Sequence, residues 1–418
     1  MTRPEACLYL VSRYPGVTHT FIVGEVRALR AADVRVETAS IRRVGRSELL
    51  SEVDQTEAGR TYAILPTNVA RLARSHGRAL ARSPGAYLRT LVRALRLSPA
   101  GGRPRLWQAF YFVESILLWD WLRSQKIRHI HVHHANVGAD VALLTCAYVN
   151  ASGASPPWTW SMTIHGPTEL IDVDSHKLAQ KVADAAAVVC ISDYARSQIL
   201  AFARPEDLAK LRTIRCGIDI DTFRRTGPHA ARAGRDRGAE ILCVAALSRR
   251  KGHRVLLQAF AEARRKQPDA RLTLVGDGPE RAALELQAAE LQLGDGVIFT
   301  GALGHDRLAA LYERADIFCL PSFAEGVPIV LMEAMAMELP VVTSNVMGIP
   351  ELVEHGRSGL VVPPARPDLL ARALLSLLGD PALREAMGAA GRARVARDYE
   401  IRDAVAALHA QLKPLLGK

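Results

Sequence analysis

Two glutamates at a fixed spacing, Glu325 and Glu333, are the residues whose chemistry stands out first in this chain. They lie in the stretch 320–342, which reads L-P-S-F-A-E-G-V-P-I-V-L-M-E-A-M-A-M-E-L-P-V-V. An apolar run at 315–320 predicts a buried strand before them. The residues 329–337 predict a helix after the intervening turn, so that one carboxylate stands in the turn and the other in the helix.

The beginning of this helix suits an anion. Its first N–H groups have no partner within the helix, and the helix dipole adds partial positive charge there. We therefore expect a phosphate site at the carboxyl end of a parallel strand. Glu325 would then lie near a sugar, while Glu333 could accept hydrogen bonds from a ribose diol. The alternative is that both are ordinary exposed helix acids.

Four consecutive residues are expected to surround the phosphate: Gly326, Val327, Pro328 and Ile329. Pro328 stands where the helix begins, and we expect the turn to need glycine at 326.

Two further loops in this half follow predicted strands. A-A-L-S-R-R-K-G follows the strand at 241–246, and its Lys251 would neutralise a diphosphate as a compact point charge. V-G-D-G-P-E follows the strand at 271–275, and Gly276 and Gly278 would allow close backbone approach. Each loop is weak evidence alone. Three loops in order, each at a strand end, predict a phosphate-bearing ligand.

The E-x7-E stretch in its E-G-x-P context resembles the signature of the retaining family 4 glycosyltransferases, which share the GT-B fold. Two segments of the first half agree: T-I-H-G at 163–166 is similar to the family pattern T-x-H-G, and I-S-x-x-x-R at 191–196 also fits. The opening strand at 6–11 and its loop resemble exopolysaccharide members, such as the colanic-acid-type enzymes. The resemblance spans nearly all 418 residues and is strongest from about 160 to 365.

This resemblance implies an α/β protein of GT-B fold, with two Rossmann-like parallel-sheet domains facing across a nucleotide-sugar cleft. It implies a retaining hexosyltransferase that moves a sugar from a UDP- or GDP-linked donor to a glycan, glycolipid or other hydroxyl acceptor. Exopolysaccharide or cell-surface glycan synthesis would be its setting. Retention would follow from attack by the acceptor hydroxyl on the face that the leaving group departs from.

The resemblance also implies roles for single residues. Lys251 and the helix amides at 327–329 would meet the charge of the leaving diphosphate, and Glu333 would hold the ribose hydroxyls. Glu325 would contact the donor sugar, and His165 would contact that sugar from the facing domain. On the acceptor side, the useful residues of the first loop would be Gly16 and His19; the alternative is that they only shape a solvated loop.

One position departs from the family pattern. The family reads G-R-L-x-x-x-K-G, and Ala246 stands here in place of its arginine. Losing a bidentate donor weakens the grip on a diphosphate, unless Arg249 or Arg250 reaches in. The alternative function is therefore a catalytically weakened GT-B protein that acts as a binding or scaffold subunit in polysaccharide assembly. A sugar-nucleotide epimerase is a further alternative, and a phosphorylase is another, although no stretch resembles a pyridoxal-lysine site.

The order of predicted elements divides the chain into two halves. Strands alternate with helices in each half, which predicts two parallel sheets covered by helices. A linker rich in Gly, Arg and Ala, at 226–239, separates the halves. We expect an acceptor-side domain at 1–225, a donor-binding domain at 226–395, and a terminal helix at 396–418 that crosses back to the first domain.

Two patterns raise the question of a metal. In the predicted strand 127–134, I-R-H-I-H-V-H-H, the side chains of His131 and His133 share one face, but no Cys or carboxylate stands at ligand spacing. The two D-x-D strings, at 172–174 and 219–221, do not follow the strand pattern of a metal-diphosphate site. We therefore expect no metal and no cofactor other than the donor substrate.

Charge indicates the class of partner. The net charge of +11 and the pI of about 9.6 favour anionic partners. The segment 69–97 holds seven Arg and no acid, with an Arg stripe before Pro84-Gly85 and an apolar face after it. Such a basic amphipathic pair predicts contact with an anionic membrane surface; a helix packed on the core with a solvated basic face is the alternative. A single aromatic residue, Tyr87, lies among these arginines and no known nucleic-acid-binding motif appears, so we expect no nucleic-acid partner.

Cysteines and the chain's beginning indicate the compartment. The six Cys are scattered, mostly in apolar runs, with no C-x-x-C, which predicts reduced and buried thiols. The residues 1–4 lead directly into a predicted strand rather than a signal peptide, and no apolar run reaches about 18 residues. We expect a cytoplasmic protein, peripheral at the inner face of the cell membrane.

Overall fold

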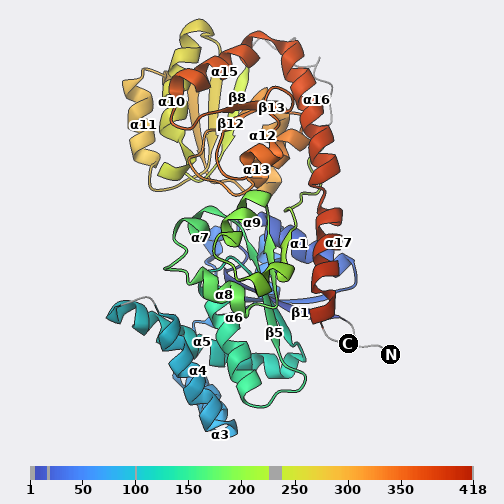
Figure 1. Ribbon diagram of the computed structural model, residues 1–418. Helices are drawn as coiled ribbons and strands as arrows, with labels where there is room; N and C mark the ends of the chain where they lie inside the picture. Colours follow the sequence, from blue (N-terminus) through green and yellow to red (C-terminus); the bar gives the residue numbers. More distant parts are fainter. Residues whose placement is uncertain (1–4, 17–18, 99–100, 226–237, 417–418) are drawn as a thin grey trace. The chain divides into compact units, whose positions relative to one another are not determined.

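The computed structural model describes residues 5–16, 19–98, 101–225 and 238–416, and the chain divides into two compact units (Figure 1). Unit 1 comprises Met1–Ile214 together with Ala404–Lys418, and unit 2 comprises Arg215–Asp403. Each unit is a parallel sheet covered by helices, as the alternation of elements predicts. Most of the predicted linker, 226–237, lies outside the described residues.

The division falls earlier in the chain than the predicted boundary at 225. The residues after Ile214 belong to unit 2 because they pack on it: Ile218 forms a β-bridge with Glu400, and the ring of Phe223 lies 5.1 Å from that of His305. At the other end, the last helix, α17 (Ile401–Leu412), enters unit 1 from Ala404 onward.

Unit 1 contains a seven-stranded sheet in the order β3-β2-β1-β4-β5-β6-β7, with all neighbouring strands parallel. Its central strands are buried along most of their length because helices cover both faces, although β4 and β5 alternate polar and apolar residues. The order reverses between β1 and β4, the point at which parallel α/β sheets bind ligands. The strands are β1 (Ala6–Arg13), β2 (Arg35–Arg42), β3 (Tyr62–Leu65), β4 (His129–His133), β5 (Thr159–Ile164), β6 (Ala187–Cys190) and β7 (Leu211–Thr213).

The helices on one side of this sheet form successive layers. Helix α6 packs on β1, β4 and β5, α5 packs on α6, and α3 and α4 pack on α5 at the outside (Figure 1). Helix α6 is apolar on all sides because the sheet and α5 both cover it. The helices of unit 1 are α1 (Thr20–Ala31), α2 (Glu52–Arg60), α3 (Val69–Arg82), α4 (Pro84–Leu97), α5 (Gly102–Gln125), α6 (Val137–Ala151), α7 (Pro167–Ile171), α8 (Leu178–Asp184) and α9 (Asp193–Leu200).

Unit 2 contains a six-stranded parallel sheet in the order β10-β9-β8-β11-β12-β13. Its order reverses between β8 and β11. The strands are β8 (Glu240–Val244), β9 (Arg271–Val275), β10 (Val297–Gly301), β11 (Ile317–Leu320), β12 (Val341–Ser344) and β13 (Gly359–Val362). The helices are α10 (His253–Lys266), α11 (Arg281–Glu290), α12 (His305–Arg314), α13 (Ile329–Ala336), α14 (Ile349–Leu352), α15 (Pro367–Gly379) and α16 (Pro381–Asp398).

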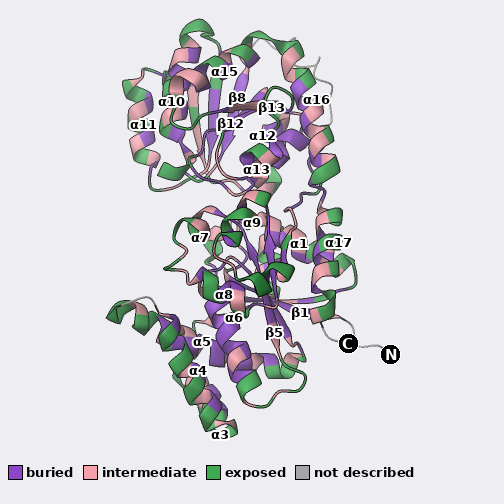
Figure 2. Ribbon diagram, in the orientation of Figure 1, coloured by how far each residue is buried: buried purple, intermediate pink, exposed green. Residues whose placement is uncertain are grey.

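The two cores are separate layers of buried strands and helix faces (Figure 2). All six cysteines are buried and none forms a disulfide bond within the described residues, as the sequence predicts. Within the described ranges, no helix combines the length and the apolar character needed to cross a bilayer.

Candidate active site

Three loops of unit 2 converge at the carboxyl ends of β8, β9 and β11. The Lys251 ammonium after β8 donates to Glu325 Oε1 after β11 at 2.6 Å, and the Phe323 amide donates to the Arg250 carbonyl at 2.8 Å. The loop after β9 joins them at 276–280. Because β8 and β11 flank the point where the strand order reverses, these loops lie where an α/β sheet binds ligands.

The pair Lys251 and Glu325 is largely enclosed. Their side chains are 17% and 9% exposed, and the Ser322 hydroxyl donates to the same Glu325 oxygen at 2.7 Å. One predicted detail is wrong: Gly326 does not adopt a left-handed φ, so the turn geometry does not itself require glycine. The hydrogen bonds to Glu325 hold the turn instead.

The glycines of the loop after β9 have a clear packing reason. A Cβ at Gly276 would lie 2.0 Å from the Ala245 carbonyl oxygen, and a Cβ at Gly278 would lie 2.5 Å from that of Leu247. Both distances are impossible for a side chain, so the two loops can touch only with glycine at these positions. The close approach is therefore between loops, and a role of these glycines in ligand binding stays a prediction.

Helix α13 presents its beginning at the same place. It starts at Ile329, with Pro328 as the preceding cap residue, and no side chain caps its first amides among the described residues. Pro328 has no N–H, so of the three predicted amide donors only those of Val327 and Ile329 can act. An uncapped helix beginning beside Lys251 is a suitable place for an anionic group.

Glu333 lies one turn into α13 and is 2% exposed. Its Oε2 accepts the Tyr312 hydroxyl at 2.8 Å, and its Oε1 lies 3.7 Å from His305 Nδ1. Burial raises the pKa of Glu333, against the opposing effects of His305 and Tyr312. Sequence reasoning missed these two partners; the position of His305, just after the loop that follows β10, is the signal that could have found it.

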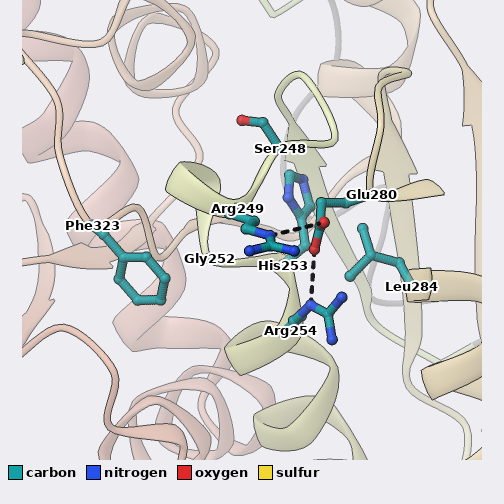
Figure 3. A pocket seen from close by; sticks show the side chains of 8 residues that line it. All are labelled: Ser248, Arg249, Gly252, His253, Arg254, Glu280, Leu284 and Phe323. Atoms are coloured by element: carbon teal, nitrogen blue, oxygen red, sulfur yellow. Dashed lines mark hydrogen bonds and ion pairs between the residues drawn. The ribbon is translucent and has the colours of Figure 1, made fainter. Parts of the chain in front are cut away.

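A cavity of about 450 Å³ opens beside the three loops (Figure 3). Glu280 stands between two arginines there: Arg254 Nε donates to it at 2.9 Å, and Arg249 Nε lies 3.3 Å from it. Arg249, one candidate to replace the guanidinium missing at Ala246, is thus engaged with Glu280. Figure 3 shows Phe323 across the cavity from these side chains. The lining residues are Ser248, Arg249, Gly252, His253, Arg254, Glu280, Leu284 and Phe323.

In unit 1, His165 follows β5 and lies within a cluster of aromatic rings. Its Nε2 lies 2.9 Å from His133 Nδ1, in a hydrogen bond between imidazoles. The rings of Phe21 and His134 lie 4.7 Å away. Burial, with the surrounding histidines, lowers the pKa of His165 well below its ordinary value, so this ring is neutral at physiological pH.

The predicted acceptor-side residues lie in the loop after β1. The Gly16 carbonyl accepts the His19 amide at 2.8 Å, and His19 Nδ1 lies 2.9 Å from the Arg13 carbonyl oxygen. Burial lowers the pKa of His19 to about 4. These contacts shape the loop, and residues 17–18 between them lie outside the described part of the chain. A role in acceptor binding stays a prediction.

Glu169 organises this site and was missed by sequence reasoning. Its Oε1 accepts the Ala135 amide at 2.6 Å, and its Oε2 accepts the amides of His165 and Gly166 at 3.2 and 3.0 Å. Burial alone would raise the pKa of Glu169, but hydrogen bonds from His134 and these amides lower it. The carboxylate therefore ties together the loops after β4 and β5.

The histidines of β4 have a carboxylate neighbour that the sequence pattern could not show. Ligand atoms of Glu25, on α1, and of His131 and His133 lie within 4.8 Å of one another. The lack of a carboxylate at ligand spacing in the sequence therefore does not mean that none lies near this strand. Both ring nitrogens of His131 are already hydrogen-bonded, to the hydroxyls of Ser161 and Thr163 at 2.7 and 3.0 Å. The expectation of a chain without a metal stays a prediction.

The predicted apolar face of the second arginine-rich helix, α4, is only partly buried. Helix α4 buries Ala86, Thr90, Ala94 and Leu97. Of the predicted apolar face, Tyr87 and Leu91 are partly buried, whereas Leu88, Val92 and Leu95 are exposed. The beginning of α5 adds Leu106, Trp107 and Phe110, also exposed. From 69 to 113 the chain has nine Arg and no acid. We call the exposed apolar and basic residues of 69–110 the α3–α5 surface.

Comparisons with known proteins identify the second half of the chain. Residues 229–394 match the family of glycosyl transferases group 1. A GDP-mannose-dependent alpha-(1-6)-phosphatidylinositol monomannoside mannosyltransferase of Mycolicibacterium smegmatis is 35% identical over 221 residues, 50% of this chain and 57% of that protein. WcaL of Salmonella typhimurium, whose name assigns it to colanic acid biosynthesis, is 31% identical over 233 residues, 54% of this chain and 55% of that protein. The chain thus spans little more than half the length of these relatives.

Solved structures resemble the whole chain. Sucrose-phosphate synthase from Thermosynechococcus elongatus has a TM-score of 0.75 at 20% identity, covering 98% of this chain and 99% of that one. HepE from Anabaena, solved in complex with UDP-glucose, has a TM-score of 0.71 at 17% identity, covering 98% and 100%. At such identities the likeness establishes the fold. Residues 229–394 therefore match the glycosyl transferases group 1 family, and the chain as a whole has the GT-B fold of these solved structures.

Proposed function

We propose that the chain is a retaining glycosyltransferase that moves a sugar from a UDP- or GDP-linked donor to a hydroxyl of a glycan or glycolipid. The observation that carries the proposal is the convergence of three strand-end loops on the pair Lys251–Glu325, 2.6 Å apart, inside the matched domain. A leaving diphosphate needs cations and N–H donors held in place before the reaction. Lys251 and the uncapped amides of α13 supply both.

The other residues have complementary roles in this proposal. Glu333 keeps one carboxylate oxygen on Tyr312, which leaves Oε1, beside His305, to accept a ribose hydroxyl. Glu325 contacts the donor sugar, and in unit 1 His165 contacts the same sugar. Gly16 and His19 shape the acceptor side. Gly276, Gly278 and the residues 326–329 bring backbone to the diphosphate. Since Lys251 and the amides neutralise the leaving group, transfer needs no metal ion, and activity should persist in EDTA.

The donor base and the acceptor are proposals as well. The Mycolicibacterium relative is named as GDP-mannose-dependent, whereas HepE was solved with UDP-glucose, so both nucleotide series must be tested. The name of WcaL favours an acceptor in exopolysaccharide synthesis. The α3–α5 surface favours a peripheral position on an anionic membrane, at its cytoplasmic face, where a lipid-linked acceptor would lie.

A second candidate function has one observation in its favour. Ala246 removes the family guanidinium, and Arg249, which could replace it, forms an ion pair with Glu280. A protein with a weakened site would bind sugar nucleotides and act as a scaffold subunit in polysaccharide assembly. It would show binding without transfer, which separates it from the first candidate.

Calorimetric titration with UDP, GDP and their common sugar conjugates tests the proposal. We expect micromolar binding of one series, loss of that binding in Glu333→Ala, and unchanged binding in Glu290→Ala, which removes an exposed glutamate at the end of α11. An acceptor screen with the donor so identified then follows. A product that keeps the donor's anomeric configuration supports the transferase. Binding without any transfer supports the scaffold, and no binding by the folded protein overturns both.

A further inference from the structure

We propose that the cavity at the beginning of helix α10 is a second binding site of unit 2, which takes a sugar that carries an anionic group. This site goes beyond the proposed function, because none of the proposed donor residues Lys251, Glu325 and Glu333 lines the cavity. Side chains of unit 2 alone form it, so the ligand can be tested without any sugar nucleotide.

The strand order places this cavity away from the proposed ribose contact. The crossovers β8-α10-β9 and β9-α11-β10 run in one direction along the sheet, whereas β10-α12-β11 and β11-α13-β12 run in the other. Because such crossovers are right-handed, α10 and α11 cover one face of the sheet, and α12 and α13 cover the other. The cavity is lined by the beginning of α10 and by Leu284 of α11, whereas Glu333 and its partner Tyr312 belong to α13 and α12. The two sites therefore lie on opposite faces.

Two guanidinium groups give the cavity its charge. Arg254 Nε and Arg249 Nε donate to the two oxygens of Glu280 at 2.9 and 3.3 Å, as Figure 3 shows. The terminal nitrogens of both arginines form no hydrogen bond with a described residue. Glu280 thus fixes the two side chains through one edge and leaves N–H groups of each for a ligand. Two cations against one carboxylate leave a net positive charge, and a guanidinium binds a carboxylate or phosphate through paired hydrogen bonds.

The beginning of α10 adds further polar groups. The helix begins at His253, and no described side chain caps it, so its first amides lack partners within the helix and carry partial positive charge. His253 itself is 2% exposed, and neither of its ring nitrogens has a well-aligned hydrogen bond within the described ranges, although the Ser248 backbone lies nearby. Burial lowers the pKa of His253 to about 4, so the neutral ring has one donor and one acceptor at pH 7. Since buried polar atoms normally have partners, a ligand hydroxyl would supply what this ring lacks.

The apolar lining indicates the shape of the ligand. Phe323 is 43% exposed and stands across the cavity from the arginines, and Leu284 lines the side of α11 (Figure 3). An aromatic face of this kind packs on the C–H face of a sugar ring and leaves the hydroxyls free for hydrogen bonds. The volume of about 450 Å³ falls within the range of small-molecule sites. Two sources have the chemistry of an anionic sugar: an acidic unit of an acceptor glycan, and a free sugar phosphate.

Saturation-transfer-difference NMR tests the site with glucuronate, glucose 6-phosphate and glucose as ligands and inorganic phosphate as a competitor. Both anionic sugars should bind at least about tenfold more tightly than glucose, which lacks the charge-assisted hydrogen bond. Arg254→Met should weaken both by about tenfold or more, whereas Arg265→Met, which removes a positive charge from the exposed end of the same helix, should leave them unchanged. Phe323→Ala should weaken the sugars without changing the affinity for inorganic phosphate. His253→Leu should weaken binding without lowering the unfolding free energy, since it removes two buried nitrogens that lack partners.

Each outcome has a defined meaning. Equal binding of glucose and glucuronate, or equal losses in Arg254→Met and Arg265→Met, overturns the site. Displacement of the anionic sugars by UDP or GDP, or their loss in Glu333→Ala, also overturns it, because the cavity would then belong to the donor site. If inorganic phosphate competes as well as the sugars bind and Phe323→Ala changes nothing, the cavity holds an anion only and the sugar is refuted.

The relative affinities distinguish the two sources of the ligand. Tighter binding of glucuronate supports an acidic unit of the acceptor, and tighter binding of glucose 6-phosphate supports a free sugar phosphate. A protein that binds the anionic sugars but no nucleotide would refute the proposed function and support this site, so the two failures are distinguishable.

Discussion

The pair Lys251–Glu325 allows the sharpest test of the donor site. Its two charges lie 2.6 Å apart with side chains 17% and 9% exposed. Removing one partner from such a pair leaves the other charge poorly solvated, which typically costs 3–5 kcal/mol. We expect Lys251→Met and Glu325→Gln each to lower the unfolding free energy of unit 2 by about 3 kcal/mol. The double variant has no lone charge, so its loss should fall short of the sum by about 2 kcal/mol.

The assay must report on unit 2 alone. All five Trp lie in unit 1, so tryptophan fluorescence does not see this change. Hydrogen exchange of the amides in β8 and β11 gives the opening free energy of the sheet that carries the pair. The same three proteins can be compared with Arg265→Met, which removes one positive charge from the exposed end of α10.

Nucleotide binding should separate the two partners. A diphosphate takes Lys251 away from Glu325, and a charge-assisted hydrogen bond contributes about 1.5–3 kcal/mol. Lys251→Met should therefore weaken binding of the preferred nucleotide diphosphate by about ten- to a hundredfold, measured by calorimetry. Glu325→Gln should bind it at least as tightly as the wild type, because a negative charge beside the phosphates is gone. Equal weakening in both variants, or additive effects on hydrogen exchange, would refute the reasoning.

Three further predictions concern unit 1. The buried Lys181 donates to Asp140 at 2.9 Å, so Lys181→Met should lower the unfolding free energy by about 3–5 kcal/mol. Urea titrations followed by tryptophan fluorescence measure this loss, and a loss no larger than that of Lys126→Met, at an exposed lysine, would contradict the prediction. Burial lowers the pKa of His129 to about 3, so the folded protein keeps this ring neutral while the unfolded chain takes up a proton below about pH 6.5. The contribution of the neutral ring to stability is therefore fully present above about pH 6.5 and is lost as the pH falls, by about 1.4 kcal/mol per pH unit. Between pH 7.5 and 5.5, His129→Gln should therefore lose about 1.4 kcal/mol less unfolding free energy than the control His176→Gln. An equal loss in both variants would exclude titration of His129 as the cause. The α3–α5 surface should bind phosphatidylglycerol vesicles in sedimentation, and the binding should weaken at high salt. The double variant Leu88→Glu with Trp107→Glu should reduce binding at least tenfold, since each new charge opposes both insertion and attraction to the anionic lipid. An equal loss in Leu286→Glu, at an exposed leucine of unit 2, would contradict a specific surface.

The sequence alone determined the local elements and the loops that carry the donor site. Apolar runs and helical spacing predict most strands and helices because burial on a sheet leaves a periodic trace. The three strand-end loops with Lys251, Gly276 and Glu325 were recognisable since parallel strands bring their carboxyl ends to one edge. Even the departure at Ala246 was visible as a residue type out of place.

Only the tertiary structure decided which distant residues meet. The sheet order of unit 1 places β1 beside β4 and brings Glu25 of α1 to His133, a proximity that no spacing within one strand encodes. Glu169 joins two loops in the same way, and Tyr312 reaches Glu333 from another helix. Periodicity reports that a face is apolar but not which face is covered. On α4, which packs on α5 and α6, Ala86, Thr90, Ala94 and Leu97 are buried, whereas Leu88, Val92 and Leu95 lie exposed.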